Sequence, residues 1–343
     1  MMKKKIKRIL IGASAFTAGA AAVVGLTYKV TKEMMKVALD REQPKVNEKV
    51  QNKFSGSKGQ ENTFEELAAM SENLKNSDCE FVEITAPDGT VLAGHWHECD
   101  KAERVMIAMH GWRSSWSKDF GAISDFWHKN NCSVLYVEQR GQGQSGGDYM
   151  GFGLTERYDC LAWINWVNEK GNSKLPIYLC GISMGASTVL MAAGLDLPEN
   201  VHGIMADCGY TSPHDIWKHI MKNNLRLPYN VITSAIANDI CKKKIQVTSK
   251  DYSCIDAMRE CKVPVFFVHG SDDHFVPVEM TYENYKVCAA PKRLLIVPGA
   301  EHGMSYMVDR KGYEDAVKRF WNEFDGYLNP ADTDSMEKGA KNG

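Results

Sequence analysis

The sequence lacks the patterns that usually cross-link a chain, hold a structural metal or attract nucleic acid. None of its ten cysteines forms a Cys-x-x-Cys pair, and they are scattered without regular spacing from Cys79 to Cys288. This argues against a disulfide framework and against a structural zinc site. The formal net charge is only −2, so there is no electrostatic reason to expect a nucleic-acid partner. The composition of the 343 residues, 44% hydrophobic and 24% charged, is typical of a globular protein with a sizeable core.

The amino terminus differs from everything after it. A basic cluster from Lys3 to Arg8 precedes an uncharged run from Ile9 to Tyr28, which is just long enough to span a bilayer as a helix. The basic cluster favours the cytoplasmic side. We therefore expect residues 1–30 to be a membrane anchor, with the rest of the chain outside the cytoplasm. A signal peptide cleaved near Ala18-Gly19-Ala20 is one alternative. A helix of a cytosolic protein is another, and it fits the unpaired cysteines better.

The rest of the chain divides by composition. Residues 31–77 are polar and predict a spacer, and residues 329–343 predict a disordered tail. Between them, over residues 78–328, apolar strands alternate with helical segments. That alternation predicts an α/β domain with a mostly parallel sheet covered on both faces. Its first two strands, joined by a tight turn at Pro87-Asp88-Gly89, predict an antiparallel edge.

Residues 211–262 interrupt this alternation with helical segments and no clear strand. An insertion at this point would lie over the carboxyl ends of the strands, where open α/β sheets bind ligands. Its apolar side chains suit either a surface for acyl chains or the insertion's own packing core. They are Trp217, Ile220, Met221, Leu225 and Leu227. The run Lys242-Lys243-Lys244 is interpreted as a solvated corner, with contact to lipid headgroups as the alternative.

One short stretch organises the domain. An apolar strand runs into Gly181-Ile182-Ser183-Met184-Gly185, the Gly-x-Ser-x-Gly pattern of a nucleophile elbow. A serine at such a turn stands above the sheet, and the flanking glycines let the next helix pack closely. The amide of Met184, at the helix N-terminus, can hold a developing oxyanion. A glycine-rich turn with an ordinary serine is the alternative.

A nucleophilic serine requires a base and a carboxylate, in the chain order serine, acid, histidine. His302, in the glycine-flanked loop after the last strand, is the expected base. The acid is expected from the adjacent pair Asp272 and Asp273 after the preceding strand. Asp207, at the end of an earlier strand, is an outside alternative for the carboxylate.

The second oxyanion donor is expected after the third strand, where Gly111 allows a sharp turn and the amide of Trp112 would face that of Met184. A plain turn is the alternative. His110, His128, His202 and His269 are expected to be structural, and His274 is expected to be a polar loop residue. His95, His97 and Cys99 share one strand face, which suits a metal site, but exposed strand residues explain them better.

Together these pieces resemble the α/β-hydrolases, in the branch of serine-aminopeptidase-like and lysophospholipase-like enzymes, and bacterial members with an N-terminal hydrophobic segment in particular. The resemblance covers about Asp78 to Tyr327. It rests, in chain order, on His110-Gly111, the segment Gln139 to Ser145, the elbow at Ser183, His269-Gly270 with an aspartate, and His302. It implies the α/β-hydrolase fold with about eight strands and a small helical cap at residues 211–262. The family pattern His-Gly-x-x-Asp-x-x-Val-Pro places the acid at Asp273.

The resemblance also implies acyl transfer to water without a metal or organic cofactor. Ser183 would attack the carbonyl of a small-molecule ester with His302 as base, while the amides of Trp112 and Met184 hold the oxyanion. Cleavage of short peptides is the alternative within enzymes, and transfer to an acceptor other than water is another. A non-enzymatic binding or signalling module on the same scaffold is the alternative from a different class.

Overall fold

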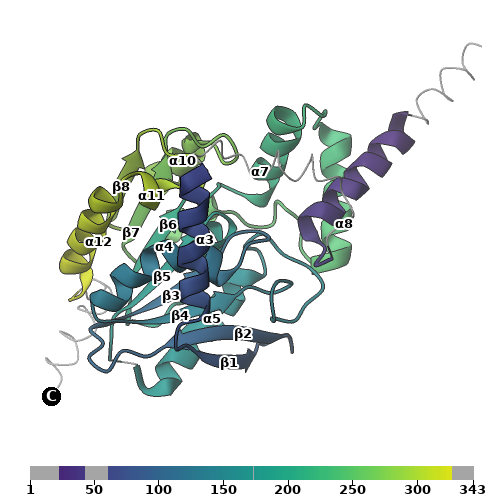
Figure 1. Ribbon diagram of the computed structural model, residues 1–343. Coiled ribbons are helices and arrows are strands. Elements are labelled where there is room, and N and C mark those ends of the chain that lie inside the picture. The colour runs from purple at the N-terminus through teal and green to yellow at the C-terminus, as the bar shows by residue number, and fades with distance from the viewer. Residues whose placement is uncertain (1–22, 43–60, 173, 327–343) are drawn as a thin grey trace, which may run out of the picture.

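The computed structural model describes residues 23–42, 61–172 and 174–326, and its centre is an eight-stranded sheet (Figure 1). The strand order is β1-β2-β4-β3-β5-β6-β7-β8. Six strands pair in parallel, and β1 and β2 form an antiparallel edge. This confirms the predicted sheet and its edge. The strands are β1 (Glu80–Thr85), β2 (Val91–His97), β3 (Arg104–Met109), β4 (Cys132–Glu138), β5 (Ile177–Ile182), β6 (Val201–Asp207), β7 (Val265–Gly270) and β8 (Lys292–Val297).

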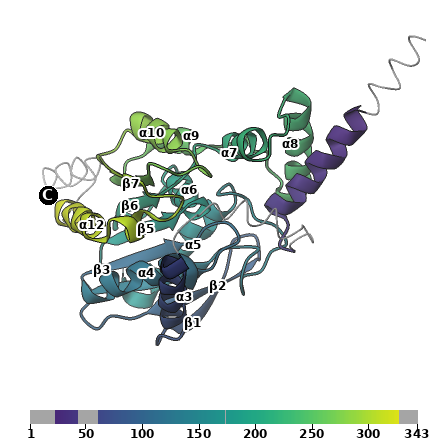
Figure 2. The ribbon, with the colours of Figure 1, turned by 45° about the horizontal axis from the view of Figure 1, so that its top comes forward.

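Helices cover both faces of the sheet (Figures 1 and 2). Two short π-helical segments, η1 (Asn168–Asn172) and η2 (Ile220–Asn224), continue α5 and α7. The α-helices with defined bounds are α3 (Glu61–Lys75), α4 (Trp116–Lys129), α5 (Glu156–Val167), α6 (Met184–Ala192), α7 (Pro213–His219), α8 (Val231–Ile245), α9 (Cys254–Glu260), α10 (Val278–Val287), α11 (Ser305–Val308) and α12 (Arg310–Phe324).

The central strands supply side chains to two separate cores, one on each face. In β3 the odd-numbered Val105 and Ile107 join the core under α5 and α6, whereas Met106 and Ala108 join the core under α4 and α12. Successive side chains of a strand point to opposite faces. Because both faces are covered, β3 is buried along its whole length, which is why Val105 to Met109 form an unbroken apolar run after Arg104.

The structure corrects the prediction of a polar spacer over residues 31–77. Residues 23–39 are helical (purple in Figures 1 and 2), and we call this segment the docked helix. Its Met35 and Leu39 are 4% and 0% exposed and belong to the main core. Residues four apart lie on the same face of a helix, so Thr31, Met35 and Leu39 form one buried stripe along the docked helix.

The second helix of the predicted spacer, α3, packs across α4. Leu74 of α3 is buried in the core between α4 and the sheet. Gly121 of α4 makes the close crossing possible, since a Cβ atom there would lie 2.8 Å from the backbone of Met70. Composition did not reveal this contact, because most of the α3 surface faces solvent and only a few positions are apolar.

The predicted anchor, residues 1–30, falls mostly outside the described residues. Within the described part of the chain, no helix is long and apolar enough to cross a membrane. Val23, Val24 and Leu26, at the start of the described part, are exposed on the docked helix. The anchor therefore stays a prediction. The predicted tail, residues 329–343, also lies outside the described residues.

Between β6 and β7 the chain forms α7, η2, α8 and α9. Figures 1 and 2 show α8 beside the docked helix, on the carboxyl-end side of the sheet. A salt bridge of 2.6 Å joins Lys244 of α8 to Asp40, which follows the docked helix. Lys243 pairs with Asp239 of its own helix. Two of the three clustered lysines thus have carboxylate partners.

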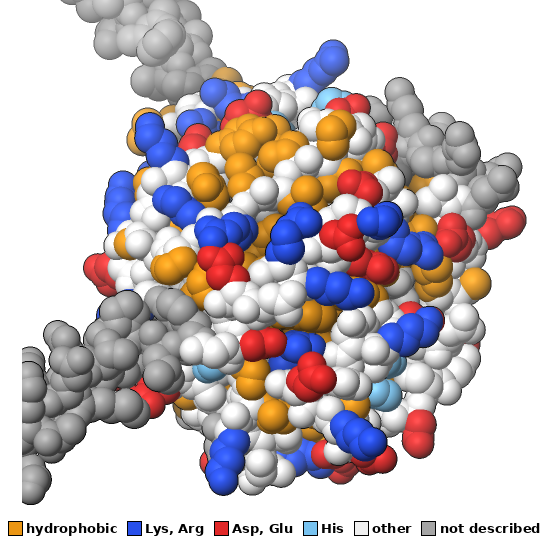
Figure 3. Space-filling model, turned by 90° about the vertical axis from the view of Figure 1, so that its left-hand side faces the viewer, with side chains coloured by type: hydrophobic (Ala, Val, Ile, Leu, Met, Phe, Trp, Pro, Cys, Tyr) orange, Lys and Arg blue, Asp and Glu red, His pale blue; other side chains and the backbone are white. Residues whose placement is uncertain are grey.

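The surface has no strong charge bias on the face that Figure 3 shows, where acidic and basic side chains are interspersed around apolar strips. This agrees with the small net charge.

Candidate active site

Ser183 occupies the sharp turn between β5 and α6 in a backbone conformation that few residues adopt. Its φ and ψ are 56° and −115°, a combination that costs on the order of 1–3 kcal/mol and persists only where the surroundings enforce it. Both flanking glycines are required, because a side chain at either position would clash with nearby backbone atoms. A Cβ atom on Gly181 would lie 2.3 Å from the carbonyl of Gly185, and one on Gly185 would lie 1.8 Å from the carbonyl oxygen of Met109. The turn therefore matches the elbow geometry.

Ser183, His302 and Asp273 form a continuous chain of hydrogen bonds. The Ser183 hydroxyl lies 2.9 Å from Nε2 of His302, and Nδ1 of His302 lies 2.6 Å from Oδ2 of Asp273. Ser183 follows β5, Asp273 follows β7 and His302 follows β8. These three side chains meet because parallel strands end at the same edge of the sheet. With the hydroxyl donating to Nε2, the Nδ1 proton points at the carboxylate, which is the tautomer that a general base needs.

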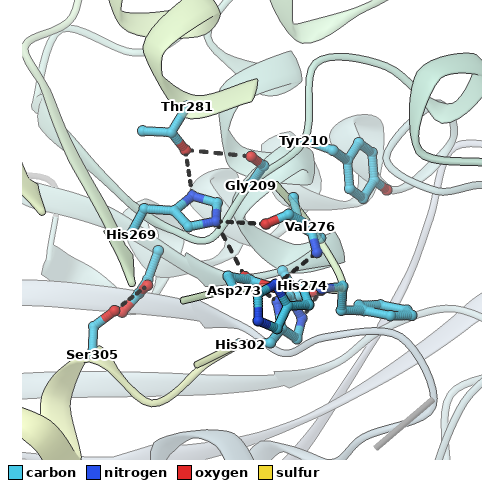
Figure 4. Close-up of polar contacts among 12 residues, drawn as sticks. Gly209, Tyr210, His269, Asp273, His274, Val276, Thr281, His302 and Ser305 are labelled. Carbon is cyan, nitrogen blue, oxygen red and sulfur yellow. Dashed lines mark hydrogen bonds and ion pairs between the residues drawn. The ribbon is translucent and has the colours of Figure 1, made fainter. Parts of the chain in front are cut away.

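The Asp273 carboxylate is fully buried, and both of its oxygens are satisfied. Oδ1 accepts from the backbone amides of Phe275 and Val276, each at 2.9 Å. Oδ2 lies between the rings of His302 and His269 (Figure 4). Burial alone would raise the pKa of Asp273, but the His302 charge and the imidazole hydrogen bonds hold it well below its usual value. The carboxylate is therefore ionised at neutral pH.

His269 fixes the loop that carries Asp273. Its Nε2 lies 3.1 Å from Oδ2 of Asp273 and 2.9 Å from the carbonyl oxygen of Val276. Since both neighbours are acceptors, Nε2 carries the proton and donates to them. On the other side of the ring, Nδ1 contacts the Thr281 hydroxyl at 2.7 Å (Figure 4). His269 thus ties down the turn, which agrees with its predicted structural role.

His302 is biased toward its charged form. Burial alone would lower its pKa, but Cys208 and Asp273 raise it well above 6.5. Burial raises the pKa of the Cys208 thiol itself to about 11, so this thiol is neutral at pH 7 and the lasting charge next to His302 is that of Asp273. Polar atoms of Cys208, Asp273 and His302 lie within 4.8 Å of one another. Sequence reasoning missed Cys208, although its position directly after β6 places it at the same sheet edge.

The other carboxylates proposed from sequence have different partners. Asp272 is exposed and accepts from Ser271 at 2.7 Å. Asp207 is buried and accepts from the Ser305 hydroxyl at 3.1 Å, and burial raises its pKa to about 6. His274 is exposed. Only Asp273 is within hydrogen-bond distance of His302 among these three acids.

The remaining histidines lie outside this hydrogen-bond chain. His110 is buried and connects Gly111 with the backbone of Gln139. His202 contacts the carbonyl oxygen of Phe324. His97 stacks on His128, and His95 pairs with Glu138 at 2.7 Å. Within the described residues, the cluster of potential metal ligands is the one at Cys208, and it does not include His95, His97 or Cys99.

The loop after β3 approaches the serine closely. A Cβ atom on Gly111 would lie 3.4 Å from Cβ of Ser183 and 3.2 Å from the Asp119 carboxylate, which accepts the Gly111 amide at 2.6 Å. Trp112, Ser183 and Met184 line a common cavity. The two predicted oxyanion donors therefore border the same cavity as the serine.

Two cavities meet at Ser183. The larger, about 470 Å³, includes His302 and carries charged side chains such as Arg113, Lys118 and Asp119. The smaller, about 50 Å³, lies on the Met184 side and is almost entirely apolar. Its walls come from the cap and from the docked helix: Trp217, Ile220, Met221, Met34, Met35 and Val37.

The docked helix is the part of the site that sequence reasoning missed. Val37 lines both cavities, and Met34 lines the smaller one. The apolar spacing of Met35 and Leu39 was a usable signal, but the surrounding charged residues obscured it.

Comparisons with known proteins agree with the architecture. Residues 100–251 match the family described as serine aminopeptidase, S33. The uncharacterized protein YqkD of Bacillus subtilis is 30% identical over 188 residues, which is 55% of this chain and 61% of YqkD. The uncharacterized protein YfhR of Escherichia coli O157:H7 is 26% identical over 251 residues, covering 70% of this chain and 80% of YfhR.

Among solved structures, the esterase Pf2001 of Pyrococcus furiosus superposes with a TM-score of 0.61. The match is 23% identical and covers 74% of this chain and 94% of the esterase. At that identity the likeness concerns the fold: a mostly parallel sheet with helices on both sides.

Proposed function

This chain is an α/β-hydrolase, and on that premise we propose that it is a serine hydrolase that cleaves carboxylic esters of small molecules through an acyl-enzyme. The observation that carries the proposal is the hydrogen-bond chain from Ser183 through His302 to Asp273, at 2.9 and 2.6 Å. Folding alone does not require a strained serine, an imidazole within hydrogen-bond distance of it and a fully buried carboxylate in one line. Nucleophilic catalysis requires all three.

The proposed reaction has two halves. His302 Nε2 takes the hydroxyl proton as Ser183 Oγ attacks the carbonyl carbon, and the amides of Trp112 and Met184 hold the resulting oxyanion. The C–O bond to the alcohol then breaks, and the alcohol leaves with the proton from His302. Water repeats the sequence on the acyl-enzyme, which releases the acid and restores Ser183. Asp273 keeps the imidazole oriented and stabilises its charged form throughout.

The two cavities suggest how the substrate lies. His302 must protonate the departing alcohol, so the alcohol belongs in the 470 Å³ cavity that includes His302. The acyl group then belongs in the 50 Å³ apolar cavity next to Met184, which has room for about four water-sized groups. We propose a short acyl group and a larger, more polar alcohol. Trp217, Ile220 and Met221 line the acyl cavity, while Leu225 and Leu227 do not.

Peptide cleavage is the second candidate, because the matching family is described as serine aminopeptidase. An aminopeptidase needs an available carboxylate to hold a substrate ammonium. The acidic residues that line the larger cavity are Asp119 and Asp207. Asp119 accepts from Gly111 and Ser114, and Asp207 accepts from Ser305. Both carboxylates therefore have roles inside the protein, which favours the ester.

The test is turnover of p-nitrophenyl esters of graded acyl length alongside aminoacyl p-nitroanilides. We expect acetate to butyrate to be cleaved faster than octanoate and the anilides to be cleaved poorly. Ser183→Ala should abolish ester cleavage and labelling by a fluorophosphonate probe. Ser271→Ala, which alters an exposed serine in the loop that carries Asp273, is the control and should keep both ester cleavage and probe labelling. Labelling of the Ser183→Ala protein would refute the assignment.

We also propose that residues 1–30, which include the first residues of the docked helix, anchor the protein in a membrane, with the domain outside the cytoplasm. The uncharged run from Ile9 to Tyr28 supports the anchor. All ten cysteines are free, which favours the alternative of a domain in the reducing cytoplasm. Membrane fractionation followed by protease treatment of intact cells separates these two placements.

A further inference from the structure

We call residues 110–115, the loop between β3 and α4 that carries Trp112, the oxyanion loop. The side chain of its Arg113 reaches the carboxyl end of the docked helix. Its guanidinium donates to the carbonyl oxygen of Val37 through Nε and Nη2, at 3.2 and 2.9 Å. The same group donates to the carbonyl oxygens of Asp40 at 2.6 Å and Arg41 at 3.4 Å. The last carbonyl oxygens of a helix accept no hydrogen bond from within the helix, and a positive charge is favourable at that end. Arg113 therefore caps the docked helix.

Trp112 makes a second connection between the same two segments. Its indole Nε1 donates to the carbonyl oxygen of Ala38 at 2.9 Å. The Arg113 guanidinium lies 5.3 Å from the centre of the Trp112 ring, within the range of a cation–π contact. The two consecutive residues that follow Gly111 are thus both attached to the docked helix.

The loop needs such support because of its backbone. Arg113 has a φ of 52°, in the left-handed region that non-glycine residues avoid. Its amide donates to Oε1 of Gln142 at 2.6 Å, which fixes one side of the peptide. The amide of the neighbouring residue, Trp112, is the proposed oxyanion donor. A change in the backbone angles of Arg113 would therefore re-aim the peptide next to that amide.

The docked helix is itself firmly attached to the domain. Leu39 is fully buried, and its carbonyl oxygen accepts from the amide of Met150 at 2.7 Å. Arg41 donates to the carbonyl oxygens of Ser145 and Gly143 at 2.5 and 2.7 Å. Lys244 adds the salt bridge to Asp40. These contacts do not involve the oxyanion loop, so they give the loop a fixed surface to bind.

We propose that the docked helix is a structural part of the active site: its carboxyl end holds the oxyanion loop in the reactive geometry, with the side chains of Arg113 and Trp112 as positioning residues. This inference rests on the proposed function, since it concerns the amide of Trp112 in the same acyl transfer. It assigns a catalytic contribution to a segment more than seventy residues away in sequence, through the pair Trp112 and Ala38.

The test is steady-state kinetics of the full-length chain carrying Arg113→Gln, with a p-nitrophenyl ester that the wild type cleaves. Loss of one oxyanion donor costs about 10²–10³ in rate, and a misaimed donor costs part of that. We expect kcat to fall about 10- to 100-fold. KM should change less than about threefold, because the oxyanion forms only in the transition state. Arg113→Lys keeps the charge but has a single donor nitrogen, so it should recover part of kcat.

Arg293→Gln is the matched control. Arg293 is half exposed, binds Glu323 and lies at the end of β8 away from the docked helix. This variant removes a guanidinium with carboxylate contacts but leaves the oxyanion loop intact, so kcat should stay at the wild-type value. If Arg113→Gln does not fold, Trp112→Phe keeps one aromatic ring and removes the indole donor. That variant should lower kcat about three- to tenfold at constant KM.

Hydrogen exchange provides a readout beyond activity. In Arg113→Gln, the backbone amides of residues 111–115 should exchange faster than in the wild type, together with those near residue 40. The inference is overturned if either variant folds and keeps wild-type kcat, or if KM rises while kcat stays constant. Its failure is distinct from that of the proposed function, which fails only if Ser183→Ala retains activity or the wild type cleaves no ester.

Discussion

The two sides of Ser183 are built in different ways. On the sheet side, Asp273 and His302 lie on short loops that directly follow β7 and β8, and hydrogen bonds of 2.6 and 2.9 Å join Asp273 to His302 and His302 to Ser183. On the cover side, the docked helix and α7, η2 and α8 supply much of the wall of the small cavity, mainly through apolar side chains. The reacting groups and the groups that enclose the substrate therefore come from separate structural units. Changes to the first should alter the rate, and changes to the cap helices of the second should alter the choice of substrate; the docked helix belongs to both, since its carboxyl end also holds the oxyanion loop.

The largest expected effect within the sheet side is that of Asp273→Asn. An amide cannot stabilise the charged imidazole and favours the wrong tautomer, so kcat should fall about 10³- to 10⁴-fold. Asp207→Asn is the matched comparison, because Asp207 is a buried carboxylate at a neighbouring strand end that binds Ser305 instead of His302. Asp207→Asn should lower kcat less than about tenfold. Equal losses in the two variants would mean that the two acids share the role.

The pH dependence of kcat/KM tests the interaction between Asp273 and His302, and its expected effect is of intermediate size. Asp273 raises the pKa of His302 above 6.5, and only the neutral imidazole accepts the serine proton. Lowering the pH through that raised pKa charges His302, so kcat/KM should fall about tenfold per pH unit, and the fall should begin above pH 6.5. The measurement is kcat/KM between about pH 5 and pH 9. In Asp273→Asn the midpoint should move to lower pH. A wild-type midpoint below 6.5 would contradict the proposed charge pair.

A substitution on the cover side should change selectivity instead of the underlying rate. Ile220→Ala removes part of the wall of the small apolar cavity. We expect kcat/KM for p-nitrophenyl octanoate to rise about tenfold relative to the acetate, while cleavage of the acetate changes little. Leu225→Ala alters a half-buried residue of the same insertion that does not line the cavity and should leave this ratio unchanged. If both variants lower kcat/KM equally for every ester, the cavity does not hold the acyl group.

The smallest expected effect concerns the attachment of the docked helix to α8. Lys244→Ala removes the partly exposed salt bridge to Asp40, which should cost about 0.5–1 kcal/mol of the free energy of unfolding after solvent screening. It should lower kcat less than twofold, because Arg113 still holds the loop. Lys242→Ala, at an exposed neighbouring position, should change neither quantity. Denaturant unfolding of the two variants measures the difference.

The core of the fold and the candidate site could be predicted because their signals are local. The glycines at 181 and 185 follow from the contact of the elbow with its own helix and with β3. Alternating apolar strands and helices indicated the sheet, and loops after parallel strands necessarily share an edge. Adjacent positions such as Asp272 and Asp273 were separated only by the family pattern, and the structure places their side chains in opposite environments, one exposed and one buried.

The cover of the site could not be predicted in the same way, because it is formed by contacts between segments that are distant in the sequence. The sequence by itself determined which side chains carry the proposed chemistry, because the elbow pattern and the strand ends bring Ser183, Asp273 and His302 to one edge. Only the tertiary structure decided what lies above them. Docking of residues 23–39 rests on a narrow buried stripe and on side-chain contacts to backbone carbonyls, such as those of Arg113 with Val37 and Asp40. Backbone carbonyls are present at every residue, so no composition or periodicity marks the ones that a distant arginine will bind.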